Sequence, residues 1–150
     1  MNFKTKPICL SGYREIDGKK TYYASKMEAN THRYLLWMRD RGIYTEVEYQ
    51  PPAFDFTAEW IEKGHGYRKV GNRKVRAIKR GCTSYKPDFR TVDNKGVEEY
   101  WETIGRWRND HTTRLSRMKR FHPEVQLNVI DSKRYRELTR QCKNLIPGWE

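Results

Sequence analysis

The spacing of hydrophobic residues divides the chain into helical and extended segments. Between Ser25 and Asp40 the hydrophobic residues recur with the period of a helix. Ser25 can cap this segment, and Glu28, three residues later, completes a capping box. The pattern therefore predicts a helix from Ser25 to about Asp40, ending before Gly42. The hydrophobic residues that set the period are Met27, Tyr34, Leu35 and Met38.

Extended segments lie on both sides of this helix. Residues 13–16 and 19–22 flank Asp17-Gly18, a strong signal for a β-hairpin. Residues 43–56 are also extended, with a break at Pro51-Pro52. Farther along, the strand-like segments 85–92 and 97–104 flank the turn sequence of residues 93–96 and predict a second hairpin.

The last third of the chain alternates between helix and strand. We expect a helix over 108–120, capped by Asn109 or Asp110, a buried strand over 125–130, and a basic helix over 133–143. At 150 residues the chain has the size of a single domain. The predicted fold is α/β, a mixed sheet of four to five strands flanked by helices.

Two carboxylates converge in the second predicted hairpin. Asp88 lies near the start of its first strand and Glu102 near the end of its second. Antiparallel pairing brings these two ends side by side, and the carboxylates repel each other unless a cation lies between them. Mg²⁺ or Mn²⁺ takes oxygen ligands of this kind. The sequence therefore predicts a metal site at Asp88 and Glu102.

These residues carry a family resemblance. Pro87-Asp88, followed by Glu102-Thr103-Ile104-Gly105, resembles the PD-(D/E)XK nuclease signature. The helix and strand that follow make the chain similar to the short phage junction-resolving endonucleases of the endonuclease I type and to related small phage nucleases. The resemblance implies a restriction-endonuclease-like core, with 83–131 as the catalytic hairpin, helix and strand. It also implies Mg²⁺-dependent cutting of Holliday-junction-like DNA by a homodimer, with Glu28 as a third acidic residue beside the metal.

The sequence departs from the family pattern at one position. The family lysine falls at Ile104, and isoleucine can neither activate water nor stabilise charge on a phosphate. We expect either that another residue takes its place or that the protein binds DNA without cutting it. The candidate substitutes are Lys86, Arg106, Lys119 and Gln50.

A strong positive charge favours a polyanionic partner. The chain has 31 Lys and Arg against 19 Asp and Glu, a net charge of +12. Residues 1–24 form a basic N-terminal arm and hairpin, and residues 57–82 look like a basic insertion with a hairpin around Gly71-Asn72. The insertion either contacts DNA, which would suit a sequence-specific homing or restriction-like enzyme, or is a solvated hairpin. The residues expected to bind DNA are Arg68, Lys69, Arg73, Lys74, Arg76, Lys79, Arg80, Arg106, Arg108, Arg114 and Arg117.

Other functional classes are less well supported. No hydrophobic run approaches the ~20 residues that span a bilayer, and the N-terminus lacks the hydrophobic core of a signal peptide. We therefore expect a cytoplasmic protein, phage-encoded by resemblance, with no membrane partner and no organic cofactor. Cys9, Cys82 and Cys142 are too scattered to predict a zinc site. A ribosome-associated or other RNA-binding domain is a further alternative, but it leaves the pairing of Asp88 and Glu102 unexplained.

Overall fold

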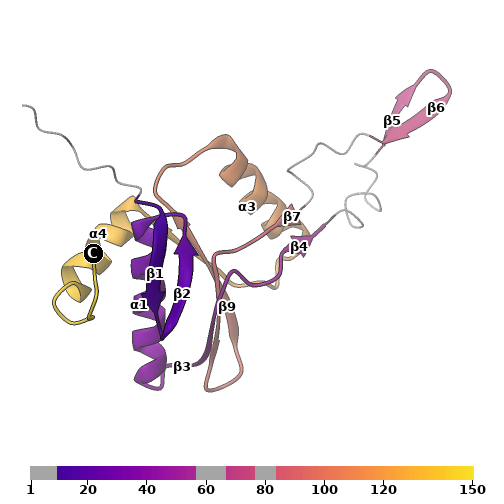
Figure 1. Ribbon diagram of the computed structural model, residues 1–150. Helices are drawn as coiled ribbons and strands as arrows, with labels where there is room; N and C mark the ends of the chain where they lie inside the picture. Colours follow the sequence, from indigo (N-terminus) through magenta and orange to yellow (C-terminus); the bar gives the residue numbers. More distant parts are fainter. Residues whose placement is uncertain (1–9, 57–66, 77–83) are drawn as a thin grey trace, which may run out of the picture.

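The computed structural model describes residues 10–56, 67–76 and 84–150. Within these residues, a mixed four-stranded sheet and three helices form the body of the molecule (Figure 1). The strand order in the sheet is β10-β9-β8-β3. Neighbours pair antiparallel except β9 and β10, which are parallel. In chain order the elements of this body are α1 (Lys26–Asp40), β3 (Tyr44–Tyr49), β8 (Phe89–Asp93), β9 (Glu98–Ile104), α3 (Asn109–Phe121), β10 (Leu127–Asp131) and α4 (Ser132–Cys142).

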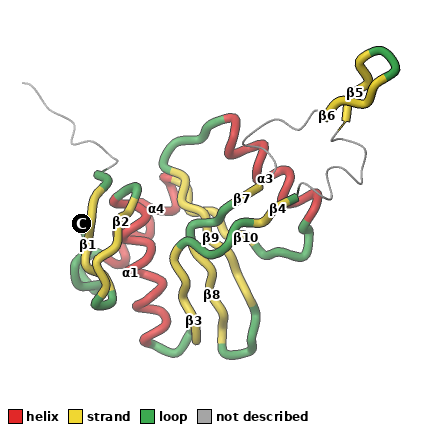
Figure 2. Tube along the Cα trace, turned by 45° about the vertical axis from the view of Figure 1, so that its right-hand side comes forward, coloured by secondary structure: helices red, strands yellow, loops and turns green. Residues whose placement is uncertain are grey.

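Helices cover both faces of the sheet. On one face, Met27 and Leu35 of α1 form a cluster with Phe89, Trp101 and Ile130, and α4 packs on its border. α3 covers the opposite face of the sheet. Its Met118 and Phe121 form a second cluster with Phe56 and Tyr85, and Leu127 of β10 packs against this cluster. The separation of α1 and α4 from α3 by the sheet is visible in Figure 2. The molecule therefore has three layers, with its core on both sides of β8, β9 and β10.

The N-terminal hairpin matches its prediction. β1 (Gly12–Ile16) pairs with β2 (Lys19–Tyr23), and Asp17 and Gly18 both have positive φ, as the tight turn requires. Tyr23 of β2 is buried between the hairpin and α1, and its hydroxyl forms a hydrogen bond of 2.6 Å with Nδ1 of His32. Burial lowers the pKa of His32 to about 4, which favours the neutral imidazole.

The structure corrects several predicted boundaries. The expected strand over 85–92 is two strands: β7 (Ser84–Tyr85) pairs with β4 (Phe54–Asp55), and β8 joins the main sheet. Pro87 lies between them, and its missing N–H interrupts the ladder. The strand expected over 125–130 is shifted to β10. The residue at the N-cap of α3 is Arg108, not Asn109 or Asp110.

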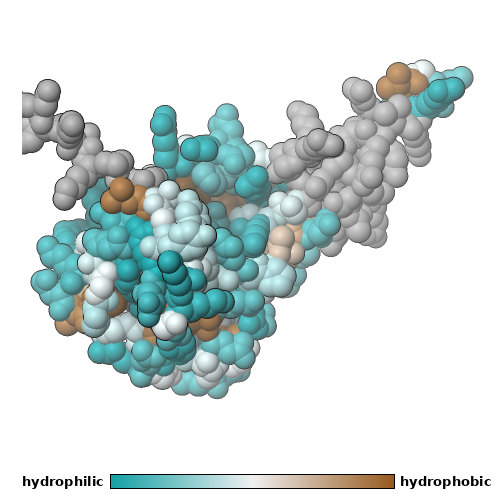
Figure 3. Space-filling model, viewed as in Figure 1, coloured by the Kyte–Doolittle hydropathy of each residue, from teal (hydrophilic) through white to brown (hydrophobic). Residues whose placement is uncertain are grey.

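Residues 57–82, predicted to be a basic insertion, are described only in part. β5 (Tyr67–Val70) and β6 (Arg73–Arg76) pair antiparallel around Gly71-Asn72, and that the segment is an insertion stays a prediction. Lys79 and Arg80 lie outside the described residues, as do residues 1–9 of the predicted N-terminal arm. On the face of the molecule shown in Figure 3, hydrophilic residues predominate and hydrophobic ones form small separate patches.

Candidate functional site

The pairing of β8 with β9 places Asp88 opposite Glu102. Phe89 pairs with Trp101, so Asp88, one residue before Phe89, lies across from Glu102, one residue after Trp101. The backbone N–H of Asp88 donates to the carbonyl of Trp101 at 3.0 Å, which extends the ladder to this position. The convergence predicted for the two carboxylates is therefore present in the structure.

Thr103 fixes the carboxylate of Asp88. Oδ2 accepts one hydrogen bond from the Thr103 backbone N–H and another from the Thr103 hydroxyl, both at 2.7 Å. Hydrogen bonds to an ionised acceptor are short and strong, and two of them hold the side chain in one orientation. The Asp88 carbonyl also accepts from the backbone N–H of Gln50 at 2.7 Å, which ties the end of β3 to the site.

Tyr85 fixes the carboxylate of Glu102. Its hydroxyl donates to Oε2 of Glu102 at 2.7 Å. The ring of Tyr85 is 3% exposed and belongs to the cluster that packs against Met118 of α3. The position of Glu102 thus depends on the hydrophobic cluster beneath α3 as well as on β9.

Glu28 brings a third carboxylate from the first turn of α1. Its backbone N–H donates to the Ser25 hydroxyl at 3.0 Å, and its Oε2 accepts from the Ala24 backbone N–H at 2.8 Å. Glu28 is only 5% exposed and lies within hydrogen-bonding reach of Asp88. Capping the helix and approaching the other carboxylates are therefore compatible roles for this side chain.

The three carboxylates interact electrostatically. Burial, then repulsion by Asp88 and a hydrogen bond with Asp88, raise the pKa of Glu28 to about 7. Burial and then repulsion by Asp88 raise the pKa of Glu102 to about 8, against the opposing hydrogen bond from Tyr85, and Glu28 adds further repulsion. Shifts of this direction mean that burial and mutual repulsion outweigh the cations and hydrogen-bond donors nearby. Such a cluster retains a proton near neutral pH or attracts a cation.

The carboxylates of Asp88 and Glu102 are compatible with a magnesium ion whose other ligands are water and substrate phosphate. Among the described residues, no group of three or more His, Cys, Asp and Glu side chains that could hold a metal ion is found. Mg²⁺, however, usually keeps several waters and is bound by one or two carboxylates together with substrate phosphates. Asp88 and Glu102 supply two carboxylates with fixed orientations, so the residues present fit this ion.

Ile104, where the resemblance predicts a lysine, is a core residue. Ile104 is 1% exposed, at the end of β9 beside Asp131 of β10. Of its four expected substitutes, Lys86, Arg106 and Lys119 are exposed. Gln50 is exposed as well, and its side-chain amide donates to the Tyr49 hydroxyl at 3.2 Å.

A cation outside this set, Arg114 of α3, is close enough to Glu102 to lower its pKa. Its charge lowers the pKa of Glu102 and that of Tyr85, in both cases against the effect of burial. Arg114 precedes Met118 by four residues and so lies on the same helix face, the face that packs toward Tyr85. The sequence predicted Arg114 only as a DNA-binding residue, because its proximity to Glu102 depends on how α3 packs.

The other residues expected to bind DNA are distributed over two places. Lys69 and Arg73 are exposed on the β5–β6 hairpin, which also contains Arg68, Lys74 and Arg76. Arg106 and Arg108 are exposed between β9 and α3, and Arg117 is partly exposed on α3. Next to Arg117 the helix surface has a hollow of about 480 Å³ lined by hydroxyl, amide and guanidinium groups of Asn109, Thr112, Thr113, Ser116, Arg117 and Arg120.

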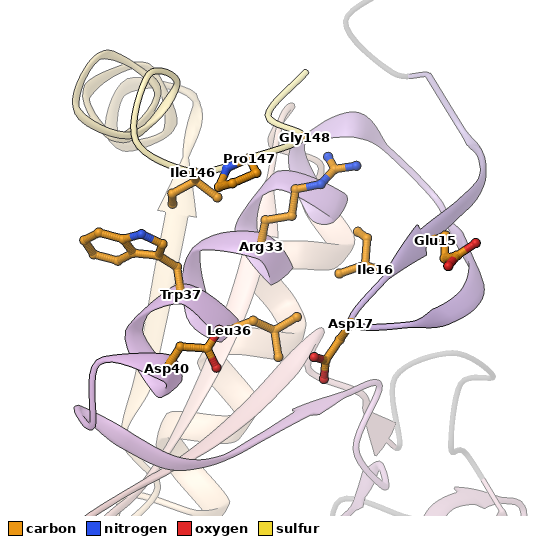
Figure 4. A pocket seen from close by; sticks show the side chains of 10 residues that line it. All are labelled: Glu15, Ile16, Asp17, Arg33, Leu36, Trp37, Asp40, Ile146, Pro147 and Gly148. Atoms are coloured by element: carbon orange, nitrogen blue, oxygen red, sulfur yellow. The ribbon is translucent and has the colours of Figure 1, made fainter.

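A separate cavity lies away from the carboxylates. It measures about 370 Å³ and lies between the β1–β2 hairpin, α1 and the C-terminal segment (Figure 4). Its hydrophobic wall includes Leu36, Trp37 and Ile146, and Glu15 and Asp17 lie at the hairpin side. None of the three clustered carboxylates lines it.

No protein-family model, curated protein or solved structure matches the chain. Among the residues that the structure describes, no helix is both long and hydrophobic enough to cross a membrane.

Proposed function

We propose that the chain is a metal-dependent DNA endonuclease that hydrolyses phosphodiester bonds, with branched DNA as its preferred substrate. The observation that carries this proposal is the convergence of Glu28, Asp88 and Glu102. Burial, and then repulsion by Asp88, raise the pKa of Glu28 and of Glu102. A protein with a net charge of +12 suits a polyanionic substrate beside such a cluster.

The order of the elements supports the same proposal. A helix, three antiparallel strands, a helix and a parallel fourth strand follow one another in the body of the molecule. This order is compatible with the restriction-endonuclease-like core that the PD-(D/E)XK resemblance implies. We assign the core to that class as part of the proposal.

Each side chain has a defined part in the proposed reaction. Asp88 and Glu102 hold Mg²⁺ or Mn²⁺, with Thr103 and Tyr85 fixing their orientation. When bound, the ion supplies charge stabilisation and lowers the pKa of a bound water. Glu28 adds a third carboxylate, and Arg114 contributes the positive charge that the family lysine would otherwise provide. Exposed arginines and lysines neutralise flanking phosphates.

A second candidate function is DNA binding without cutting. The observation in its favour is Ile104, whose buried side chain leaves the lysine position without a charge. The endonuclease and the DNA-binding protein without activity are expected to have the same affinity for DNA. They differ only in whether cleavage products form. A sequence-specific homing or restriction-like activity is a variant of the first proposal in which the β5–β6 hairpin reads bases.

Incubation with labelled DNA tests the proposal. Duplex, single-stranded and four-way-junction DNA are each treated with Mg²⁺, Mn²⁺ or a chelator, using wild type, Asp88→Ala and the remote control Glu124→Gln. We expect metal-dependent cutting, strongest on the junction, that Asp88→Ala abolishes and Glu124→Gln retains. Tight binding without products under either metal supports the second candidate instead, and unchanged cutting by Asp88→Ala excludes the assigned site.

A further inference from the structure

The loop between β9 and α3 exposes a tryptophan between two arginines. Trp107 is 51% exposed, whereas most large aromatic side chains of the described chain are buried or half-buried. Arg106 and Arg108 on either side of it are exposed as well. A single exposed hydrophobic side chain needs no explanation by itself. Its arginine neighbours and its position in the chain set Trp107 apart.

The loop is anchored at both ends. At its start, the carbonyl of Gly105 accepts a hydrogen bond from the Ser132 hydroxyl at 2.7 Å, which ties the loop to the beginning of α4. At its end, the backbone N–H of Arg108 donates to Nδ1 of His111 at 3.2 Å, where α3 begins. Trp107 therefore lies in a short loop whose two ends are fixed by hydrogen bonds. Because the loop backbone is already ordered, little of its conformational entropy is lost when Trp107 contacts a ligand.

Trp107 is exposed enough for a planar partner to reach its indole ring. The aromatic contact described for Trp107 is with His111, at 6.4 Å between ring centroids and 89° between planes. In an edge-to-face contact the two rings are perpendicular, so His111 is not stacked on the indole, and the exposed part of Trp107 remains available to a ligand. Planar groups stack on such a ring, and every nucleobase has a face that can do so.

Trp107 also lies close to the carboxylates along the chain. It follows Glu102 by five residues, so the two Cα atoms are at most about 18 Å apart even if the intervening chain is fully extended. That distance corresponds to a few nucleotides of a DNA strand. A base held at Trp107 would therefore belong to the same substrate whose phosphate reaches Asp88 and Glu102.

We propose that Trp107, with Arg106 and Arg108 on the adjacent phosphates, is a stacking site for an unpaired nucleobase of DNA. The inference rests on the proposed nuclease function and specifies its substrate class. Bases within a duplex are stacked on their neighbours and cannot present a face to the loop. Junctions, bulges and single strands present unstacked bases, so this site selects DNA with a disrupted helix.

Binding measured without metal tests the stacking site separately from cutting. Fluorescence anisotropy compares a duplex with the same duplex carrying one unpaired nucleotide, in chelator, for wild type, Trp107→Ala, Trp107→Phe and the exposed-aromatic control Tyr13→Ala. Losing a stacked base weakens binding about 5- to 150-fold. We expect Trp107→Ala to lose affinity by a factor in this range for the bulged DNA and to bind the duplex as wild type does. Trp107→Phe should retain most of the preference, and Tyr13→Ala all of it.

Other outcomes overturn the inference. Equal weakening on both DNAs assigns Trp107 to general affinity or to folding, and unchanged binding of both excludes the site. A parallel cutting assay with Mg²⁺ separates this inference from the proposed function. If wild type cuts but Trp107→Ala keeps its preference, only the stacking site fails. If wild type never cuts but Trp107→Ala loses the preference for bulged DNA, only the proposed nuclease function is wrong. If the protein binds neither DNA, both proposals are wrong.

Discussion

The hydroxyl of Tyr85 donates a hydrogen bond of 2.7 Å to Oε2 of Glu102, and this bond links the cluster beneath α3 to the carboxylate pair. It opposes the burial and repulsion that raise the pKa of Glu102. The bond therefore favours the ionised form, which is the form that binds a cation.

Tyr85→Phe removes this bond while keeping the ring. The pKa of Glu102 should then rise further above about 8, so protons compete with the metal up to a higher pH. We expect the acid limb of the pH–rate profile to move to higher pH and the cutting rate at pH 7 to fall severalfold. The stability cost should be about 1 kcal/mol. Single-turnover rates across pH 6 to 9, with exposed Tyr13→Phe as control, measure the shift, and an unchanged profile contradicts the account.

The raised pKa of Glu102 predicts how stability depends on pH. Glu102 titrates near 4.5 when unfolded and at about 8 when folded, so the folded state binds the proton more tightly. Its contribution to stability is complete below pH 4.5 and is lost as pH rises to about 8. Glu102→Gln cannot titrate, so its unfolding free energy should increase relative to wild type between pH 5 and 8. Urea unfolding in chelator at several pH values measures this difference.

A constant difference between wild type and Glu102→Gln across this range would show that the carboxylate is not destabilised by its surroundings. Magnesium provides a second readout. Because an ion that binds only the native state stabilises it, Mg²⁺ at pH 8 should raise the stability of wild type more than that of Glu102→Gln.

Arg114 is predicted to provide the charge that Ile104 lacks. Arg114→Ala should lower the single-turnover cutting rate about 10²-fold, the effect of removing one stabilising donor, and change DNA affinity little. Arg114→Lys should retain more activity than alanine because it keeps the charge. Exposed Arg136→Ala on α4 is the control. If Lys86→Ala or Lys119→Ala lowers the rate instead, the charge comes from one of the substitutes expected from sequence.

The β5–β6 hairpin is predicted to contact phosphates. The double variant Lys69→Ala/Arg73→Ala should weaken binding to all DNA sequences alike and reduce the salt slope of log K by about 2. Lys95→Ala/Lys143→Ala makes the same change of charge elsewhere and should leave the slope near that of wild type. Titrations at several salt concentrations measure both. A loss confined to one sequence would indicate base reading, as in a homing or restriction-like enzyme.

The parts of the fold that sequence predicted are those set by local chemistry. Ser25 and Glu28 mark the start of α1, and Asp17-Gly18 fixes the first hairpin, because capping and turn geometry involve neighbouring residues. The convergence of Asp88 and Glu102 followed from the pairing of adjacent strands.

Contacts between distant segments were not predictable in the same way. The pairing of β7 with β4 splits the expected strand, and the bond from Tyr85 to Glu102 depends on that pairing. The double hydrogen bond from Thr103 to Asp88 also depends on tertiary geometry. The effect of Arg114 on Glu102 depends on how α3 packs, and the exposure of Trp107 depends on the course of the loop before α3.

Single-turnover cutting of junction DNA by Asp88→Asn tests the central claim, that Asp88 and Glu102 form a metal-dependent cutting site. Asparagine keeps an oxygen that can accept from Thr103, so the substitution removes charge with little change in shape. We predict Mg²⁺-dependent cutting by wild type and by Glu124→Gln, no detectable cutting by Asp88→Asn, and DNA affinity that is unchanged or higher in the variant. Cutting by Asp88→Asn at the wild-type rate would contradict the account.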